Sequence, residues 1–276
     1  MNDIVTLLSN PTEPTATGAW FEALAERLLR RTRLMIGARP HRLLEIEFYY
    51  HGAGHEDPFA HCDPLQQSTA RWYFHRDEGS YRGGSFKGLD ISFGPEGEFG
   101  GILIRTIEAV GGAMVNGCSL SVDHALAVTG YESVAALDAA IDGRSVWDAS
   151  SPLSLVPDEG LEPRGRIWAT GRVGLTLKRM ARHPTMPEFL MKPYRFLTEP
   201  TIKKGKAHTI IAMHQAGLDV EAIRAATRSP RKTIQGYQEA YAEGEAGGEL
   251  TRYRGKGFKT RDLCVAHGIW SRVYGA

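Results

Sequence analysis

The chain has 276 residues, of which 42% are hydrophobic and 24% charged, and its formal net charge is +1 at pH 7. This ordinary globular composition fits one large domain or a domain with an appendage. The sequence has no apolar run long enough to span a membrane, and its three cysteines are too scattered for a disulfide framework. The first residues lack a basic region followed by an apolar run, so we expect that they are not a signal peptide. We therefore expect a cytoplasmic protein without a membrane partner.

Charge is distributed unevenly along the chain. Residues 1–200 hold 20 Lys and Arg against 25 Asp and Glu, whereas residues 201–276 hold 13 against 7. Such an asymmetry is typical of a nucleic-acid-binding appendage, although a solvated tail without a partner would also show it. The sequence thus predicts two domains, residues 1–200 and a basic module at residues 201–276.

The first elements are predicted from periodicity. Prolines and a glycine in the first residues indicate an extended arm. Residues 19–37 carry apolar side chains at helical spacing and finish at Gly37, which predicts a helix. A strand with alternating sides is predicted at residues 42–50, followed by mostly loop over residues 51–88.

The next elements predict a sheet with helices packed around it. Residues 89–95 alternate between apolar and polar side chains, and residues 100–112 are apolar on both faces, so the second strand should be covered on both sides. Its Arg105 would then be buried or half-buried, and a buried guanidinium needs a partner. Two helices are expected at residues 121–129 and 132–142, and two further strands at 164–176 and 192–200. The predicted fold class is α+β, mainly antiparallel.

The strand at residues 42–50 carries unusual chemistry on one face. Glu45, Glu47 and Tyr49 alternate with apolar residues, and histidines follow on a loop. From spacing alone, Glu47 could equally pair with a surface arginine while Tyr49 packs. The side chains of His51, His55, His61 and Cys62 could in principle bind zinc, but their spacing is not a standard zinc pattern, so we expect no metal.

Four stretches between residues 40 and 200 are informative because they occur together and in one order. They are the strand ending Glu47-Phe48-Tyr49 with the following "HEDPFAH", then "GGILIRTIEAVGG", then "GCSLSVDHALAVTGYESVAALD", and finally "GRVGL" with "MKPYRFL". Together they resemble the alkyladenine (3-methyladenine) DNA glycosylase family. The resemblance implies a curved antiparallel sheet and an enzyme that extrudes a base from DNA and needs no cofactor.

The resemblance also implies roles for individual residues. Glu47 would be the general base that activates water against C1′ of the flipped nucleotide, because hydrolysis of an N-glycosidic bond requires such a carboxylate. Tyr49 and His61 would enclose the base, and Phe86, with Tyr81 nearby, would wedge into the duplex. Further basic residues would contact the DNA backbone, namely Arg105, Arg172, Lys192 and Arg195.

Residues 71–90 depart from the family pattern. Gly83 or Gly84 stands where a second stacking aromatic is expected, although these glycines could simply form a turn. Asp90 replaces an asparagine at the pocket floor, and an ionised carboxylate would accept a hydrogen bond from a base amino group. The expected substrate is therefore a bulky modified base with an exocyclic amino group, such as a hypermodified phage cytosine, which would make the protein an antiviral defence enzyme. Repair of alkylated or deaminated purines is the alternative.

Residues 207–241 have helix-turn-helix spacing. A first helix should end at Gly217, a second should run through "DVEAIRAA", and a third should begin at Ser229-Pro230 with Ser229 as its cap. Residues 260–275 look like a shortened second unit with a break at Gly268. An ordinary helical subdomain would match the same spacing. The residues expected to contact DNA are Arg231, Lys232, Gln235, Arg252, Arg254 and Lys256.

The leading interpretation is a monofunctional DNA N-glycosylase with an added DNA-binding module. Two other classes stay open. One is a catalytically inactive DNA-binding protein on a glycosylase fold, favoured by the altered region at residues 71–90. The other is a hydrolase of small nucleosides, for which the basic tail would be dispensable.

Overall fold

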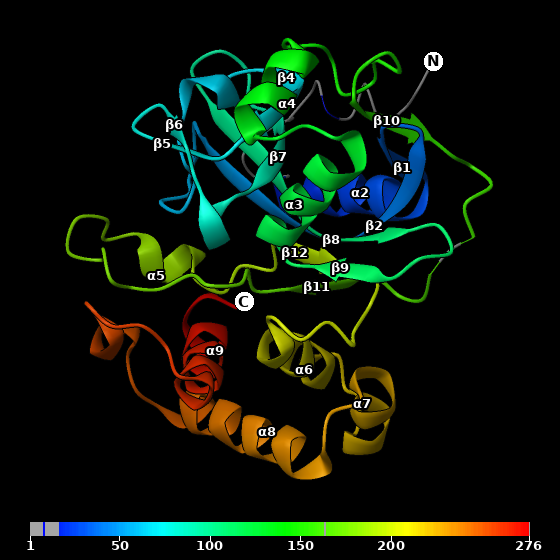
Figure 1. Ribbon diagram of the computed structural model, residues 1–276. Helices are drawn as coiled ribbons and strands as arrows, with labels where there is room; N and C mark the ends of the chain where they lie inside the picture. The colour runs from blue at the N-terminus through cyan, green and yellow to red at the C-terminus, as the bar shows by residue number, and fades with distance from the viewer. Residues whose placement is uncertain (1–7, 9–16, 163, 276) are drawn as a thin grey trace. The chain divides into compact units, whose positions relative to one another are not determined.

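The computed structural model describes Leu8 and residues 17–162 and 164–275 (Figure 1). The expected N-terminal arm falls mainly on residues that lie outside this description. The protein is an α+β structure with a curved antiparallel sheet and, within the described residues, eight α-helices. None of the helices in this part of the chain is both long enough and apolar enough to cross a bilayer.

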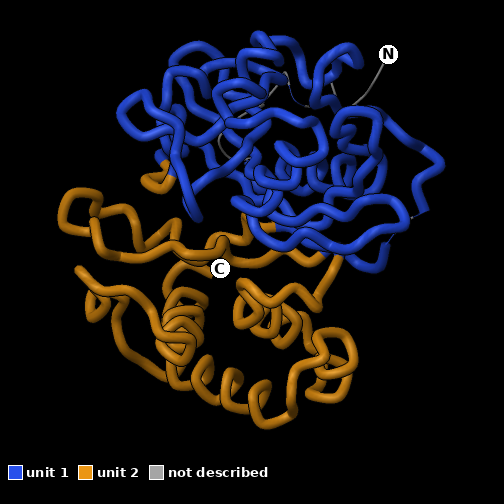
Figure 2. Tube along the Cα trace, viewed as in Figure 1, with its two compact units in different colours: residues 1–56, 60–167, 196–198 blue, residues 57–59, 168–195, 199–276 orange. Residues whose placement is uncertain are grey.

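The chain divides into two compact units (Figure 2). Unit 1 comprises residues 1–56, 60–167 and 196–198, and unit 2 comprises residues 57–59, 168–195 and 199–276. Unit 2 is thus larger than the module predicted at residues 201–276. The reason lies within unit 2, where the buried Arg172 pairs with Asp57 and the indole of Trp270 donates to the Glu188 carbonyl at 2.9 Å.

Unit 1 is built on antiparallel strands in the spatial order β10–β1–β2–β8–β7–β4. Short strands β3 and β9 extend β2 and β8, and β12 pairs with β2. The strand bounds are β1 (Thr32–Ile36), β2 (Arg39–Gly52), β3 (His55–Glu56), β4 (Thr69–Phe74), β5 (Arg76–Asp77), β6 (Ser80–Tyr81), β7 (Leu89–Phe93), β8 (Phe99–Ala109), β9 (Met114–Asn116), β10 (Leu153–Pro157) and β12 (Arg195–Leu197). Its helices are α2 (Thr17–Arg30), α3 (Cys118–Thr129) and α4 (Val134–Ile141), with 3₁₀ turns η2 (Pro64–Gln66) and η3 (Gly84–Phe86).

The apolar face of the sheet is covered by α2. Phe21 of this helix stacks on Phe48 of β2 with ring centroids 4.5 Å apart, and Trp20 meets Phe93 of β7 at 5.0 Å. All four rings are buried. Since side chains alternate along a strand, packing Phe48 under α2 turns Glu47 and Tyr49 to the other face. The hydrophobic pattern therefore fixes which face carries the polar residues.

Two predicted segments differ from the structure. The helix predicted at residues 19–37 ends at Arg30, and residues 32–36 instead form β1, which makes a hairpin with β2. Gly37, expected to stop a helix, has φ of +54° and lies in the hairpin turn. The segment 51–88, expected to be mostly loop, contains β4, which pairs with β7. Both missed strands are short and become recognisable through pairing with distant partners.

The other predicted elements of unit 1 are confirmed. The strand expected at residues 42–50 is β2, those at 89–95 and 100–112 are β7 and β8, and the two predicted helices are α3 and α4. The strands expected at 164–176 and 192–200 are reduced to three residues each, β11 (Trp168–Thr170) and β12.

Unit 2 is mainly helical. Its elements are β11, α5 (Met186–Phe189), α6 (Lys206–Gln215), α7 (Val220–Thr227), α8 (Arg231–Ala246), η4 (Leu250–Tyr253) and α9 (Thr260–Tyr274). The Asp219 side chain caps α7 by accepting from the Ala222 amide at 2.8 Å. Ser229 does not cap α8 as predicted, because Pro230 occupies the cap position and the helix begins one residue later.

Glycines allow α8 and α9 to pack closely. A Cβ on Gly244 of α8 would lie 2.0 Å from the Val265 carbonyl oxygen, and a Cβ on Gly268 of α9 would lie 2.0 Å from that of Tyr241. Gly268 was predicted as a break within the last unit, but Gly268 and Gly244 both lie inside continuous helices. A residue without a side chain lets the two helix backbones approach each other.

We expect Gly268→Ala to destabilise the protein by about 1–3 kcal/mol, because the added methyl group has no space and the helices must separate. Gly236→Ala is the matched control. Gly236 also lies inside α8, but its Cβ would meet nothing within 4 Å. The control should be neutral or stabilising by up to about 1 kcal/mol. Urea unfolding measures both, and equal effects of the two substitutions would contradict the close-packing account.

Candidate functional site

The polar face of the sheet carries one row of aligned side chains. Glu47 of β2 pairs with Leu103 of β8, Leu103 pairs with Asp90 of β7, and Asp90 pairs with Tyr73 of β4. Residues directly opposite each other on paired strands point to the same face. Two carboxylates and a tyrosine from three different strands thus share one surface. All three are buried, with exposed fractions of 0%, 2% and 1%.

Arg105 holds the two glutamates of β2. Its Nε donates to Glu45 at 3.1 Å and its Nη1 to Glu47 at 3.3 Å. Hydroxyls supply further hydrogen bonds: the Tyr49 hydroxyl donates to Glu47 at 2.8 Å, and the Thr106 hydroxyl donates to Glu45 at 2.5 Å. The predicted need of Arg105 for a partner is confirmed, and the partners are the site carboxylates.

A β-bulge places the glutamates around Arg105. The register of β2 against β8 shifts between Leu43 and Ile46, so Glu45 pairs with Thr106 and Ile46 with Ile104, while Arg105 lies opposite the bulge. An extra residue in one strand re-aims its side chains and bends the strand. The irregularity lets one guanidinium reach carboxylates two positions apart.

The electrostatics of this cluster favour charged groups. Burial by itself would lower the pKa of Arg105, but the attraction of Glu47 and then of Glu45 outweighs burial and raises the pKa. A guanidinium shared by two buried carboxylates is costly to disrupt, since removal of one partner leaves uncompensated charge in a region shielded from water.

Asp90 lies in a hydrogen-bonded chain built over two glycines. It accepts from His75 Nε2 at 2.7 Å and from Gln66 Nε2 at 3.5 Å. A Cβ on Gly88 would lie 2.4 Å from the His75 ring, and one on Gly101 would lie 2.5 Å from the Asp90 carboxylate. The absence of both Cβ atoms lets the chain from His75 through Asp90 to Gln66 lie flat on the sheet.

His61 lies at the open side of this chain. Its ring is 4.2 Å from that of His75, and no hydrogen bond to its ring nitrogens occurs within the described residues. Part of the His61 side chain is exposed to solvent, while neighbouring protein atoms surround its ring. Desolvation, followed by the repulsion of His75, lowers the pKa of His61 to about 4, so the imidazole is neutral at physiological pH. A neutral imidazole offers one donor and one acceptor to a ligand.

The two aromatic residues expected at the DNA gap differ in their surroundings. Phe86, in η3, is 71% exposed. Tyr81 is held within unit 1, because its hydroxyl donates to Asp138 at 2.7 Å while Arg76 lies over its ring at 4.3 Å. Only Phe86 therefore projects as a wedge would.

The structure corrects the role predicted for two arginines. Arg172 and Arg195 were expected at the DNA backbone, but both are 0% exposed. Arg172 pairs with Asp57, and Arg195 donates to Thr170 and Thr209 at 3.0 and 3.2 Å. Both guanidiniums are structural residues of unit 2, because they are buried and donate from their Nη atoms to protein acceptors. Arg105 is likewise turned inward.

Lys192 keeps part of its surface in solvent. Its ammonium pairs with Glu188 at 3.2 Å and lies 4.7 Å from the centre of the Phe189 ring. It is the one residue of that predicted set with a partly exposed cation among the described residues.

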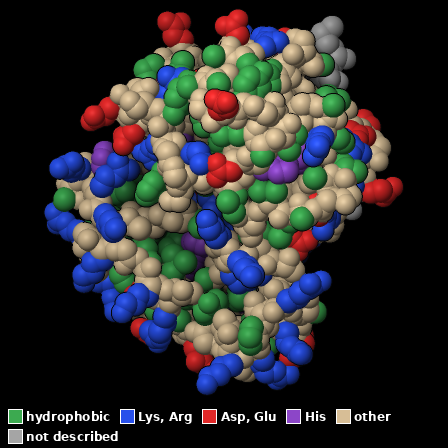
Figure 3. Space-filling model, in the orientation of Figure 1, with side chains coloured by type: hydrophobic (Ala, Val, Ile, Leu, Met, Phe, Trp, Pro, Cys, Tyr) green, Lys and Arg blue, Asp and Glu red, His purple; other side chains and the backbone are tan. Residues whose placement is uncertain are grey.

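The basic residues predicted in the helical module are largely exposed. Lys and Arg outnumber Asp and Glu over unit 2 on the face drawn in Figure 3. The exposed set comprises Arg231, Lys232, Gln235, Arg252, Arg254 and Lys256. Ile234 and Tyr241 of α8 are buried. Arg231 also pairs with Glu221 of α7 at 2.5 Å, so it is not wholly available to a ligand.

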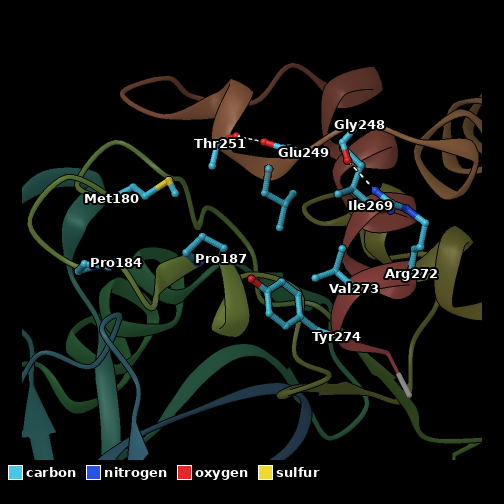
Figure 4. Close-up of a pocket in the computed structure, with 11 residues that line it drawn as sticks. Met180, Pro184, Pro187, Gly248, Glu249, Thr251, Ile269, Arg272, Val273 and Tyr274 are labelled. Atoms are coloured by element: carbon cyan, nitrogen blue, oxygen red, sulfur yellow. Dashed lines mark hydrogen bonds between the residues drawn. The ribbon is translucent and has the colours of Figure 1, made fainter.

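Unit 2 also contains an open pocket of about 710 Å³ (Figure 4). Apolar residues such as Met180, Leu250 and Ile269 line it together with polar residues such as Glu249 and Thr251. Arg272 at its edge donates to the Gly248 carbonyl at 2.6 Å. The pocket contains none of the residues singled out from the sequence.

Within the described part of the chain, no group of three or more His, Cys, Asp or Glu side chains is arranged to hold a metal ion. Of the histidines considered for zinc, His55 bonds through Nδ1 to the Tyr50 carbonyl at 2.9 Å.

Sequence reasoning missed His75, Gln66 and Tyr73. Gln66 had a local signal, since the "DPLQ" sequence forms a capping box in which Asp63 and Gln66 exchange hydrogen bonds. His75 and Tyr73 had no such signal, because Tyr73 belongs to the strand β4 that was not predicted and His75 directly follows it.

No model of a known protein family matches this chain. The chain is similar to an uncharacterized protein of Acanthamoeba polyphaga mimivirus, with 29% identity over 203 residues that cover 68% of this chain and 90% of that protein. The description of that relative names no activity, so function has to be argued from the site.

We expect Arg105→Ala to lower the free energy of unfolding by about 3–5 kcal/mol, because two buried carboxylates lose their counter-charge. Arg164→Ala is the control, since Arg164 pairs with Glu108 at the end of the same strand but is 39% exposed. It should cost about 0–1 kcal/mol. Denaturant unfolding of both variants tests the difference, and a small effect at Arg105 would show that the cluster is not a stabilising element.

Proposed function

We propose that the protein is a DNA N-glycosylase that excises a modified base and leaves an abasic site. The observation that carries this proposal is the clustering of Glu47, its partner Arg105, and Asp90 on one face of the sheet. The resemblance noted in the sequence assigns Glu47 the role of general base, and the same residue is the one that Arg105 and Tyr49 hold in place.

Glu47 suits the activation of one water molecule. In the proposed step, Glu47 takes a proton from water while the water oxygen forms a bond to C1′. The C1′–N bond breaks, and its electron pair leaves with the base. Positive charge that develops on the sugar is stabilised by the nearby carboxylates. Arg105 pairs with Glu47 and fixes its rotamer.

Extrusion of the base requires a group that fills the gap in the duplex. Phe86 is suited to this role because 71% of its surface is exposed and it lies on a short turn. The proposed substrate is a bulky modified base with an exocyclic amino group, such as a hypermodified phage cytosine, and antiviral defence is the proposed role. Repair of alkylated or deaminated purines is the alternative use of the same chemistry.

The helical module is proposed to bind the DNA backbone. The succession of the three helices α6, α7 and α8 supports this proposal, and the exposed basic residues in α8 and in the segment 252–256 offer contacts for phosphates. Phosphate contacts give affinity without reading the sequence, so the module would concentrate the enzyme on DNA.

We expect Glu47→Gln to lower base release at least about 100-fold, because an amide cannot take a proton from water. Glu45→Gln is the matched control, since Glu45 lies on the same strand, is equally buried and shares Arg105. It should retain most of the activity. Released bases are measured by mass spectrometry from phage, alkylated and deaminated DNA, with affinity for DNA measured in parallel. Equal losses in the two variants would remove the assignment of Glu47.

We expect replacement of Arg252, Arg254 and Lys256 by alanine to weaken DNA binding and its salt dependence. The slope of log K against log salt should become shallower by about 0.9 for each phosphate that the variant no longer neutralises. A control of equal charge replaces Arg27, Arg31 and Arg33, which pair with Glu159 and Asp158 in unit 1. Unchanged slopes in the first variant would exclude these residues from DNA binding.

A further inference from the structure

A buried hydroxyl without a partner lies beside Asp90. Tyr73 is 1% exposed, and its hydroxyl makes no hydrogen bond. Burial, followed by the charges of Asp63 and Asp90, raises the pKa of Tyr73, so the hydroxyl stays protonated and can donate.

An unsatisfied buried hydroxyl costs free energy that phenylalanine would not incur at the same place. Tyr73 is also the cross-strand partner of Asp90, so both side chains point to the same face. Its ring lies 5.8 Å from that of His75 and 6.3 Å from that of His61. The Tyr73 hydroxyl, a donor without an acceptor, therefore lies among the residues proposed to enclose a base.

Asp90 offers the complementary function. One carboxylate oxygen is held by His75 at 2.7 Å, and the other has the long contact to Gln66 at 3.5 Å. A carboxylate has about four acceptor positions, so this pair of contacts leaves capacity for a ligand donor. His75 and Gln66 fix the carboxylate in place and act as positioning residues.

We propose that Asp90 and Tyr73 together read a base edge on which an amino group stands next to a ring nitrogen acceptor, as in cytosine and adenine. Asp90 accepts from the exocyclic amino group, and the Tyr73 hydroxyl donates to the neighbouring ring nitrogen. Uracil and hypoxanthine carry a carbonyl oxygen in place of the amino group, and this oxygen would face the carboxylate without a hydrogen bond. The inference rests on the proposed glycosylase and names its substrate class.

The test uses the full chain and matched bases that differ at this edge. Single-turnover release is compared for DNA containing 5-hydroxymethylcytosine or 5-hydroxymethyluracil. Binding of free cytosine, uracil, adenine and hypoxanthine is measured by calorimetry. Wild type should favour the amino-bearing member of each pair at least about tenfold, the discrimination that one satisfied or unsatisfied polar group can give. Asp90→Asn should abolish or invert this preference, because its amide can donate to a carbonyl oxygen.

The Tyr73→Phe variant distinguishes a role of the hydroxyl in ligand recognition from a role in the stability of the fold. If the hydroxyl serves a ligand, the variant should melt at the same temperature as wild type or higher, yet lose at least about fivefold in binding or release of the amino-bearing bases. A lower melting temperature with unchanged preference would overturn the role of Tyr73, and an unchanged preference in Asp90→Asn would overturn that of Asp90.

We call the pair Asp90 and Tyr73 the recognition edge. Its failure is distinguishable from failure of the glycosylase activity. Preferential binding of free cytosine and adenine without release from any DNA would support the recognition edge and overturn the glycosylase. Release from both hydroxymethylated DNAs at equal rates would support the glycosylase and overturn the recognition edge. Replacement of His75 by glutamine provides a further readout. This variant should raise KM more than it lowers kcat, because His75 orients Asp90 and does not touch the reacting bond.

Discussion

The shared guanidinium of Arg105 is the constraint on which the polar face of the sheet depends. Two carboxylates on one strand, both fully buried, share it as their counter-charge. Thr106 and Tyr49 add hydroxyl donors to Glu45 and Glu47, respectively. The sheet thereby holds acidic groups inside a protein at positions where apolar side chains would be more stable, and such a cost in stability points to function.

Glycines shape the packing in both units because they have no side chain. Gly88 and Gly101 leave the space in which His75, Asp90 and Gln66 form their chain, and an alanine at either position would collide with it. In unit 2, Gly244 and Gly268 do the same for two helix backbones. In each case glycine is required because neighbouring atoms occupy the space that a Cβ atom would need. A turn is not the reason, since none of the four glycines has a positive φ.

Buried arginines have a similar structural role in unit 2. Arg172 joins Asp57 to the segment after β11, and Arg195 links β11 to α6 through threonine hydroxyls and backbone carbonyls. These bonds draw residues 57–59 and 168–195 into the unit that also contains the exposed basic helices. An arginine count therefore overstates the positive charge exposed at the surface, because Arg172 and Arg195 are fully buried.

Side-chain spacing was sufficient to predict the strongly periodic elements and the face on which Glu47 lies. The alternation in β2 and the apolar run of β8 predict these two strands, because such patterns act locally. The need of Arg105 for a partner also followed from the chain alone, since a charge in a covered strand cannot stay unpaired.

The identity of that partner emerged from the folded chain, because a β-bulge brings Glu45 and Glu47 to Arg105. Likewise β1 and β4 depend on pairing with strands that are distant in the sequence, and β4 positions the site residues Tyr73 and His75. Periodicity carries no information about such partners, so these residues could not be placed before the pairing of the strands was known.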